Sequence, residues 1–190
     1  TEADGVVRCD VRDQASVDTA VAEAVERLGG LDVLVANAGG PPPARALEVT
    51  DEQLFAALNA NLVTSVRLVR EARPHMRAAG WGRICCITSS AVKQPIPQLA
   101  LSNAARTGLW AWAKTAAADL FAEGITLNLA CPGLHATERV LGPGGRGAGD
   151  RALGDPDDFG RVVAFLCSQP AAFVSGTAVL VDGAATLGLL

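Results

Sequence analysis

The sequence lacks tyrosine altogether, and it has one methionine, two histidines and only 4% aromatic residues. Without tyrosine, no step of its chemistry uses a phenol as proton donor or acceptor. The sequence also lacks an uninterrupted apolar run of the roughly 18 residues that span a membrane. Residues 1–4 have neither the basic start nor the apolar core of a signal peptide. We therefore expect a cytoplasmic protein with no membrane partner.

The sequence also lacks a strong excess or cluster of charge of either sign. The formal net charge is −4, and no basic run or aromatic-interleaved patch is present. Nucleic-acid binding needs such a patch, so we expect no nucleic-acid partner. The 190 residues, 49% of them hydrophobic, suffice for one sizeable core and are few for two. The prediction is one domain spanning 1–190.

The cysteines show no pattern typical of a bridge or a metal centre. Their number is odd, and they lack Cys-x-x-Cys or histidine spacing. They fall in or beside expected strands, or at the end of an expected helix: Cys9, Cys85, Cys86, Cys131 and Cys167. We expect reduced thiols in the core and no metal site.

Strand-like and helix-like segments alternate along the chain. The expected strands are 6–10, 32–36, 83–88, 125–130 and 178–182, and the expected helices are 17–28, 50–79, 102–123 and 156–168. Ser16 is expected to cap the first helix, and Thr50 with Gln53 forms a capping box for the second. This alternation predicts an α/β fold with a doubly wound parallel sheet, in which 32–36 is buried on both faces.

Several short motifs follow one another in a fixed order. They are Cys9-Asp10-Val11, Asn37-Ala38-Gly39, Asn59-Ala60-Asn61-Leu62, Ile87-Thr88-Ser89-Ser90, the segment 102–106, Asn128 with Pro132-Gly133, and Val181-Asp182-Gly183. This series resembles the short-chain dehydrogenase/reductase family over essentially the whole chain. The resemblance implies a Rossmann-type fold and an oxidoreductase that uses NAD or NADP on a small carbonyl or alcohol substrate.

The start of the chain departs from that family. A dinucleotide-binding sheet begins with a strand and a glycine-rich turn that meets the pyrophosphate, whereas Gly29-Gly30 follows an expected helix. The resemblance implies that this first βαβ portion lies upstream of Thr1. The strand at 6–10 would then lose its neighbour, and 33–36 would gain an exposed edge. The residue that separates NAD from NADP would also lie upstream.

The resemblance assigns one group of residues to the cofactor cleft. Asp10, with Val11 beside it, would accept from the adenine amino group, although capping of the following turn is an alternative. The other members are Asn37, Ala38, Gly39, Pro132, Gly133 and Thr137. For the Asn-Ala-Gly tripeptide, a simple tight turn is the alternative. The segment 138–154 would be a substrate lid or an ordinary surface loop, rich in glycine.

The catalytic positions carry changed residue types. Asn61 would hold a water of the proton relay, and Ser89, or Ser90 in its place, would orient the substrate carbonyl. Ser102 stands where the family has its tyrosine, and Arg106 stands where it has a lysine that also binds ribose. Serine is a far weaker acid than a phenol, and a guanidinium does not share its proton as an ammonium can.

Three functional readings stay open. The first is an oxidoreductase with impaired or altered proton transfer, in which Lys93 or His135 could supply the proton. The second is a non-catalytic relative that binds a ligand or serves in an assembly, and the third is an unproductive fragment. Apolar positions on 51–79 and 102–123 predict a homodimer or homotetramer: Leu62, Val66, Val69, Leu109, Trp112 and Ala116.

Overall fold

A four-stranded parallel sheet forms the centre of the molecule. The computed structural model describes residues 5–142 and 152–188. The strands lie in the order β1 (Val33–Ala36), β2 (Gly82–Ile87), β3 (Ile125–Pro132) and β4 (Ala178–Val181). Each pairs in parallel with the next, with Val35 opposite Cys85 and Cys85 opposite Asn128. The sequence therefore predicted the α/β class and the parallel sheet correctly.

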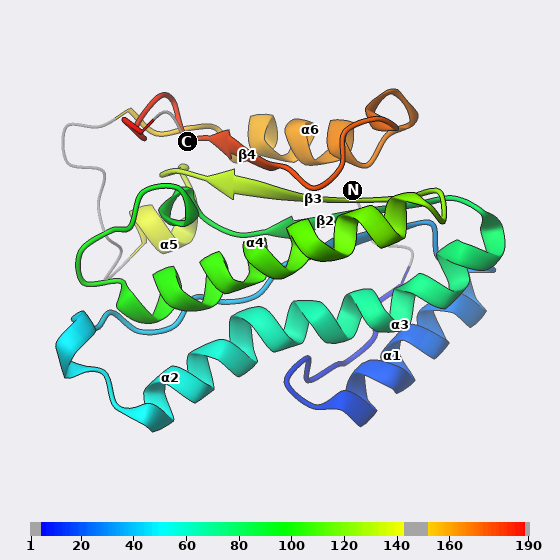
Figure 1. Ribbon diagram of the computed structural model, residues 1–190, viewed down its shortest axis with the longest axis horizontal. Helices are drawn as coiled ribbons and strands as arrows, with labels where there is room; N and C mark the ends of the chain where they lie inside the picture. The colour runs from blue at the N-terminus through cyan, green and yellow to red at the C-terminus, as the bar shows by residue number, and fades with distance from the viewer. Residues whose placement is uncertain (1–4, 143–151, 189–190) are drawn as a thin grey trace.

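Helices lie on both faces of this sheet (Figure 1). One face is covered by α3 (Thr64–Ala79) and α4 (Ala100–Phe121), while α6 (Pro156–Leu166) packs on the other face. Helix α1 (Gln14–Leu28) packs on α3, and α2 (Asp51–Leu58) packs on α4. Short helical turns occupy Ala46–Glu48, Ser90–Val92, Glu138–Leu141 (α5) and Gln169–Ala171. The doubly wound arrangement confirms the predicted fold.

The core lies mainly between the sheet and the α3–α4 layer. Met76 of α3 and Leu109 of α4 are buried against Leu127 of β3. A smaller apolar cluster, with Cys85, Ala130 and Leu166, lies under α6. The central strands β2 and β3 are buried almost throughout, as parallel strands covered on both faces should be.

The long helix expected at 50–79 is continuous but changes its winding. Thr50 and Gln53 form the expected capping box at the start of α2. A π-helical turn at Asn59–Val63 then joins α2 to α3. Such a turn inserts extra backbone into the helix and widens it, often at functional sites. Asn61 lies within this widened part of the helix.

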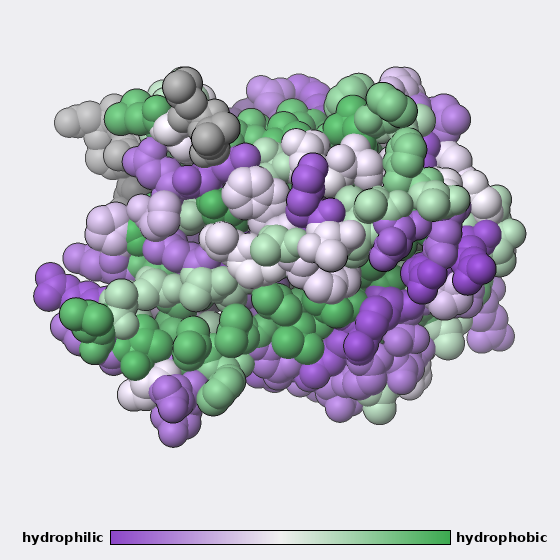
Figure 2. Space-filling view, viewed as in Figure 1, coloured by the Kyte–Doolittle hydropathy of each residue, from purple (hydrophilic) through white to green (hydrophobic). Residues whose placement is uncertain are grey.

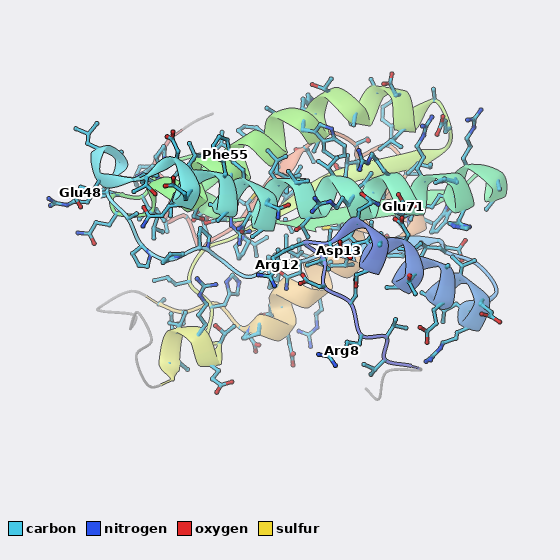
Figure 3. The ribbon with its side chains drawn as sticks, turned by 90° about the horizontal axis from the view of Figure 1, so that it is seen from below. Arg8, Arg12, Asp13, Glu48, Phe55 and Glu71 are labelled. Carbon is cyan, nitrogen blue, oxygen red and sulfur yellow. The ribbon has the colours of Figure 1, made fainter. Side chains whose placement is uncertain are left out.

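The strand expected at 6–10 is wrong, because this segment forms no strand within the described residues. A strand needs a partner ladder, and this segment leads into the start of α1 instead. There Arg67 of α3 donates to the Arg12 carbonyl over 2.9 Å, and Gln14 donates to Glu71 over 3.1 Å. Figure 3 shows Arg12 and Asp13 beside α3, with Glu71 nearby. The segment is thus tied to a helix layer and not to the sheet.

The cap of α1 also differs from the expected one. Helix α1 begins at Gln14, and the Asp13 side chain accepts from the Ser16 amide over 2.9 Å. Ser16 uses its own hydroxyl to accept from the Asp10 amide over 2.9 Å. Aspartate and serine are comparable N-caps, so the sequence alone did not separate the two positions.

Strand β1 is an edge strand in the described part of the chain. It pairs only with β2 there, and Val33 and Val35 are 41% and 46% exposed. The expectation that 32–36 is buried on both faces is therefore wrong, whereas the exposed edge inferred from the family comparison is confirmed. None of the described helices is long and apolar enough to cross a membrane.

Gly124 offers a test of how the α4–β3 turn fixes the core. Its φ is +79°, and a Cβ there would lie 2.4 Å from the Gly80 carbonyl oxygen. Strain and overpacking each cost about 1–3 kcal/mol, so Gly124→Ala should destabilise the protein by about 2–4 kcal/mol in denaturant unfolding. Gly160→Ala is the matched control, because nothing lies within 4 Å of its Cβ position on α6. An equal effect of both changes would contradict this account.

Candidate active site

A cavity of about 350 Å³ opens at the carboxyl ends of β1, β2 and β3. Ligands bind at this edge of open α/β sheets. Among the residues proposed from the sequence, the cavity brings together Asn37, Ser89, Ser102, Arg106, Pro132, Gly133 and Thr137. These come from four separate segments of the chain. Their convergence makes this cavity the candidate active site.

Two hydroxyl groups enter the cavity from different elements. Ser89 follows β2 in extended conformation, and its Oγ accepts from the Ala91 amide over 3.1 Å. Its hydroxyl proton remains available for a second partner. Ser102 lies in the first turn of α4, where the helix is continuous with no proline or glycine nearby. The described residues give its hydroxyl no hydrogen-bond partner.

Arg106 lies one turn after Ser102 and is 7% exposed. Its Nη1 donates to the carbonyls of Ile87 and Thr88 over 3.1 and 3.0 Å, and its Nη2 donates to the Ala38 carbonyl over 3.3 Å. Burial lowers the pKa of Arg106, and the positive charge of Arg139 lowers that pKa further. Arg106 thus joins the end of β2 to the loop after β1.

The loop after β3 forms the opposite wall. Gly133 allows a close approach, because a Cβ there would lie 2.7 Å from the Cβ of Asp182. The Gly133 amide donates to the Val181 carbonyl over 3.0 Å. Thr137 precedes α5 without capping it through its side chain, and it is exposed. None of the described residues is a hydrogen-bond partner of its hydroxyl, which can therefore meet a ligand.

Five proposed residues do not line the cavity: Asp10, Val11, Ala38, Gly39 and Asn61. Ala38 contributes through its carbonyl, which Arg106 binds. Asp10 is held by Arg12, whose Nε and Nη2 donate to its two carboxylate oxygens over 3.0 and 2.9 Å. The hydrogen bonds from Arg12 lower the pKa of Asp10 to about 2.

Comparison with known proteins agrees with this geometry. Residues 1–186 match the family described as Enoyl-(Acyl carrier protein) reductase. The chain is 32% identical to the 3-oxoacyl-(acyl-carrier-protein) reductase MabA of Mycobacterium avium, over 96% of this chain and 74% of that protein. It is 31% identical to the acetoacetyl-CoA reductase of Shinella zoogloeoides, over 94% and 77%.

A solved structure shows the same likeness. The crystal structure of a Burkholderia xenovorans protein described as a short-chain dehydrogenase/reductase superposes with a TM-score of 0.83 and 30% identity. The match covers 94% of this chain and 73% of that one. The chain belongs to the short-chain dehydrogenase/reductase family. The family resemblance inferred from the short motifs is thereby confirmed.

Asn61 lies in the π-turn of this short-chain dehydrogenase/reductase and is 2% exposed. Its Nδ2 donates to the Ala57 carbonyl over 3.3 Å, while its buried Oδ1 has no partner in the described residues. An unpaired buried oxygen costs about 1–3 kcal/mol. This oxygen fits the water-holding role expected for Asn61.

The two alternative proton donors lie in different surroundings. Lys93 does not line the cavity; its Nζ lies 4.0 Å from the centre of the Trp110 ring. His135 does line the cavity, is 8% exposed, and packs edge-on against Phe159. Its Nδ1 lies 3.4 Å from the Gly133 carbonyl oxygen. The geometry therefore favours His135 over Lys93 as a group that can reach a bound ligand.

Sequence reasoning missed some residues of the cavity, chiefly Thr88, Phe159 and Arg139. The one available signal was the position of Arg139, two residues after Thr137. Part of the expected lid, 138–154, lies outside the described residues, namely 143–151. Of the remainder, Glu138–Leu141 forms α5.

The cysteine thiols are the remaining potentially reactive groups near the sheet. All five cysteines are free. Burial raises the pKa of Cys86 to about 12, and burial also raises the pKa of Cys131, beside Thr88. The described residues contain no group of three or more histidines, cysteines, aspartates and glutamates placed to hold a metal ion.

Arg106→Lys tests the role of the buried guanidinium. An ammonium is a compact point charge and does not reproduce the planar fork, so at least one of the three carbonyls should lose its partner. We expect a loss of about 1–3 kcal/mol in the free energy of unfolding. Arg161→Lys, on the exposed face of α6, should change stability by less than about 0.5 kcal/mol. Unchanged stability of the Arg106 variant would rule out this clamp.

Proposed function

We propose that this chain is an NAD- or NADP-dependent oxidoreductase that acts on a small carbonyl or alcohol substrate in the cavity. Residues 1–190 would belong to a single domain of the dinucleotide-binding type. The observation that carries this proposal is the meeting of Ser89, Ser102 and Arg106 with the loop Pro132–Thr137 at the carboxyl edge of the sheet. The names of the relatives support it, because MabA and the acetoacetyl-CoA reductase are both reductases of oxoacyl compounds.

The cavity fits the nicotinamide end of such a cofactor. It lies between the loop after β1 and the loop after β3, where doubly wound sheets bind ligands. Pro132, Gly133 and the free hydroxyl of Thr137 would contact the nicotinamide side, and Asn37, Ala38 and Gly39 would form the opposite wall. Asp10, with Val11, would contact the adenine. A bound nicotinamide supplies or accepts the hydride.

Ser89 is suited to orient the substrate oxygen. Its Oγ is fixed by the Ala91 amide, so its proton can be donated to a carbonyl and stabilise the negative charge that develops there. Ser102 faces the same cavity but is a weak acid. Proton transfer to the substrate oxygen therefore proceeds slowly through a water beside Ser102, or through another group such as His135.

One observation favours a second function, a relative that binds a ligand without turnover. The chain has no tyrosine, and the Arg106 guanidinium donates three of its five N–H groups to backbone carbonyls. Such a protein would keep the cavity and lose the proton relay. The two functions differ in turnover and not in binding.

We also propose that the chain forms a homodimer or homotetramer. The reason given by the sequence needs correction, because Val69 and Leu109 are buried within the chain's own core, and Leu62, Trp112 and Ala116 pack against it. Better support comes from hydrophobic surface over α2 (Figure 2). There Phe55 is 67% exposed, and the preceding Leu47 is fully exposed.

Sedimentation tests this assembly. At micromolar concentrations the chain should sediment as a dimer or tetramer, and Phe55→Ser should shift it toward the monomer by removing apolar contact area. Leu187→Ser, which changes another exposed apolar residue far along the chain, is the control and should leave the assembly intact. A monomeric unmodified protein would contradict the proposal.

The proposed activity is tested by restoring the missing groups. Loss of general acid help costs about 10²- to 10⁴-fold. A protein that joins this chain to the phosphate-binding βαβ portion that the family resemblance implies should therefore oxidise NADH or NADPH slowly with a carbonyl substrate, and the variants below are made in that protein. Ser102→Tyr with Arg106→Lys should raise that rate by a factor within this range. Ser102→Tyr alone, which keeps the Arg106 clamp, should raise it less. Rates are compared below the unfolding midpoint of the least stable variant.

Adding Ser89→Ala to the double variant should remove most of the gain. Fast turnover by the unmodified chain would show that another group donates the proton, and His135→Ala should then abolish that turnover. Absence of turnover in every variant, together with saturable binding of a dinucleotide, would favour the non-catalytic function.

A further inference from the structure

The charge of the cavity is unbalanced. Among the described residues, its lining contains two arginines, Arg106 and Arg139, and a histidine, His135, but no aspartate or glutamate. Serine and threonine hydroxyls supply its remaining polar side chains, apart from Asn37. A concave site lined by one sign of charge concentrates ligands of the opposite sign.

Arg139 is an exposed residue whose side chain lines the cavity. Its guanidinium packs on Gly40, where a Cβ would lie 2.7 Å from Nη2 and 3.1 Å from Nη1. In the part of the chain that the structure describes, Arg139 makes no hydrogen bond or ion pair, unlike Arg12 with Asp10, Arg73 with Glu123 and Arg161 with Asp158. Gly40 thus leaves room for a guanidinium fork that nothing else in the described structure engages.

The Arg106 guanidinium repels that of Arg139 across the cavity. Arg106 is fixed in the cavity wall by its three carbonyls and keeps part of its fork free. The pKa of Arg106 is lowered, first by burial and then by the charge of Arg139. Within the described structure these two like charges face one space with no acidic side chain in its lining, and an anion between them would relieve their repulsion.

We propose that the cavity binds an oxyanion, a carboxylate or a phosphate, through Arg139 with Arg106 behind it. A guanidinium binds either group through two parallel N–H donors. Ser89 and Ser102 lie on the same cavity, so a ligand held in this way presents a neighbouring oxygen to their hydroxyls. The substrate would then be a small oxo or hydroxy acid, or a phosphate ester of similar size. This substrate class rests on the proposed oxidoreductase function, whereas anion binding does not.

Calorimetric titration with inorganic phosphate and with malonate, at constant ionic strength, tests the anion site directly. Both probes should bind the unmodified chain, and Arg139→Gln should weaken binding by about 10- to 100-fold, as expected for loss of a charged hydrogen-bonding partner. The affinity of Arg139→Lys for both probes should lie between those of the unmodified chain and Arg139→Gln. Arg161→Gln removes the same charge from the surface of α6 and should have no effect. Failure of both probes to bind, or equal weakening by the two glutamine variants, would overturn the proposal.

A second titration identifies the source of the anion. If the site takes the substrate's carboxylate or phosphate, malonate should bind equally well in the presence of saturating NADH or NADPH. If the site takes a phosphate of the dinucleotide, the cofactor should displace malonate, and Arg139→Gln should weaken cofactor binding. Either result keeps the oxyanion site and chooses its ligand.

Turnover separates this inference from the proposed function. The chain with Ser102→Tyr and Arg106→Lys should reduce 2-oxobutyrate in preference to butanone, and adding Arg139→Gln should remove that preference in kcat/KM. Reduction of butanone with equal efficiency would overturn the substrate class and leave the oxidoreductase function standing. No reduction of either compound, with Arg139-dependent malonate binding, would overturn the function and leave the anion site standing.

Discussion

The buried guanidinium of Arg106 is the interaction on which the site depends. A charged group taken out of water needs hydrogen-bond partners, and the carbonyls of Ile87, Thr88 and Ala38 supply three of them. These carbonyls lie where β2 and the loop after β1 leave the sheet. The hydrogen bonds between strands end at this point, so the carbonyls need another donor. One side chain of α4 thereby satisfies two strand ends and fixes the distance between them. The walls that carry Ser89 and Asn37 are both positioned by it.

The π-turn is the second constraint, and it has a measurable cost. Asn59–Val63 widens the long helix where it faces α4, and it turns Asn61 into the protein with its Oδ1 unpaired. Thr64 helps to close the turn, because its hydroxyl donates to the Asn59 carbonyl over 2.9 Å. A buried acceptor without a partner is tolerated where function uses it. Under the proposed function, this oxygen would hold the water of the proton relay, although residue 102 is a serine.

The sequence predicted the layers better than it predicted the edges. Period and capping located the helices to within a few residues, because Thr50–Gln53 and Gly124 are local signals that tertiary packing does not override. The predicted strand at 6–10 is wrong for the opposite reason, because a strand forms only beside a partner strand. No local pattern shows that Arg67 and Glu71 bind the residues that follow this segment to α3. Val35 is likewise exposed because β1 has no second neighbouring strand in the described chain, which the local sequence does not show.

The sequence predicted which residues the backbone brings to the cavity. It did not predict which partners the charged side chains bind there. Ser89, Ser102 and Thr137 follow strand ends or helix turns at spacings that the family resemblance supplied, and the cavity gathers them. That Arg106 would bind carbonyls could not be read from the spacing, since a lysine at the same position would reach different atoms.

The replacement of a phenol by a serine changes what the cavity can do electrostatically. A phenol beside a cation both stabilises a developing oxyanion and delivers its proton, and the two effects act on the same atom. Here the positive charges of Arg106 and Arg139 remain in the cavity while the acid is gone. Such a site stabilises negative charge on a ligand before and after any reaction, and interactions that are equal in both states improve binding without raising turnover. If both proposals hold, tight binding of anions and slow chemistry would follow from one arrangement of residues.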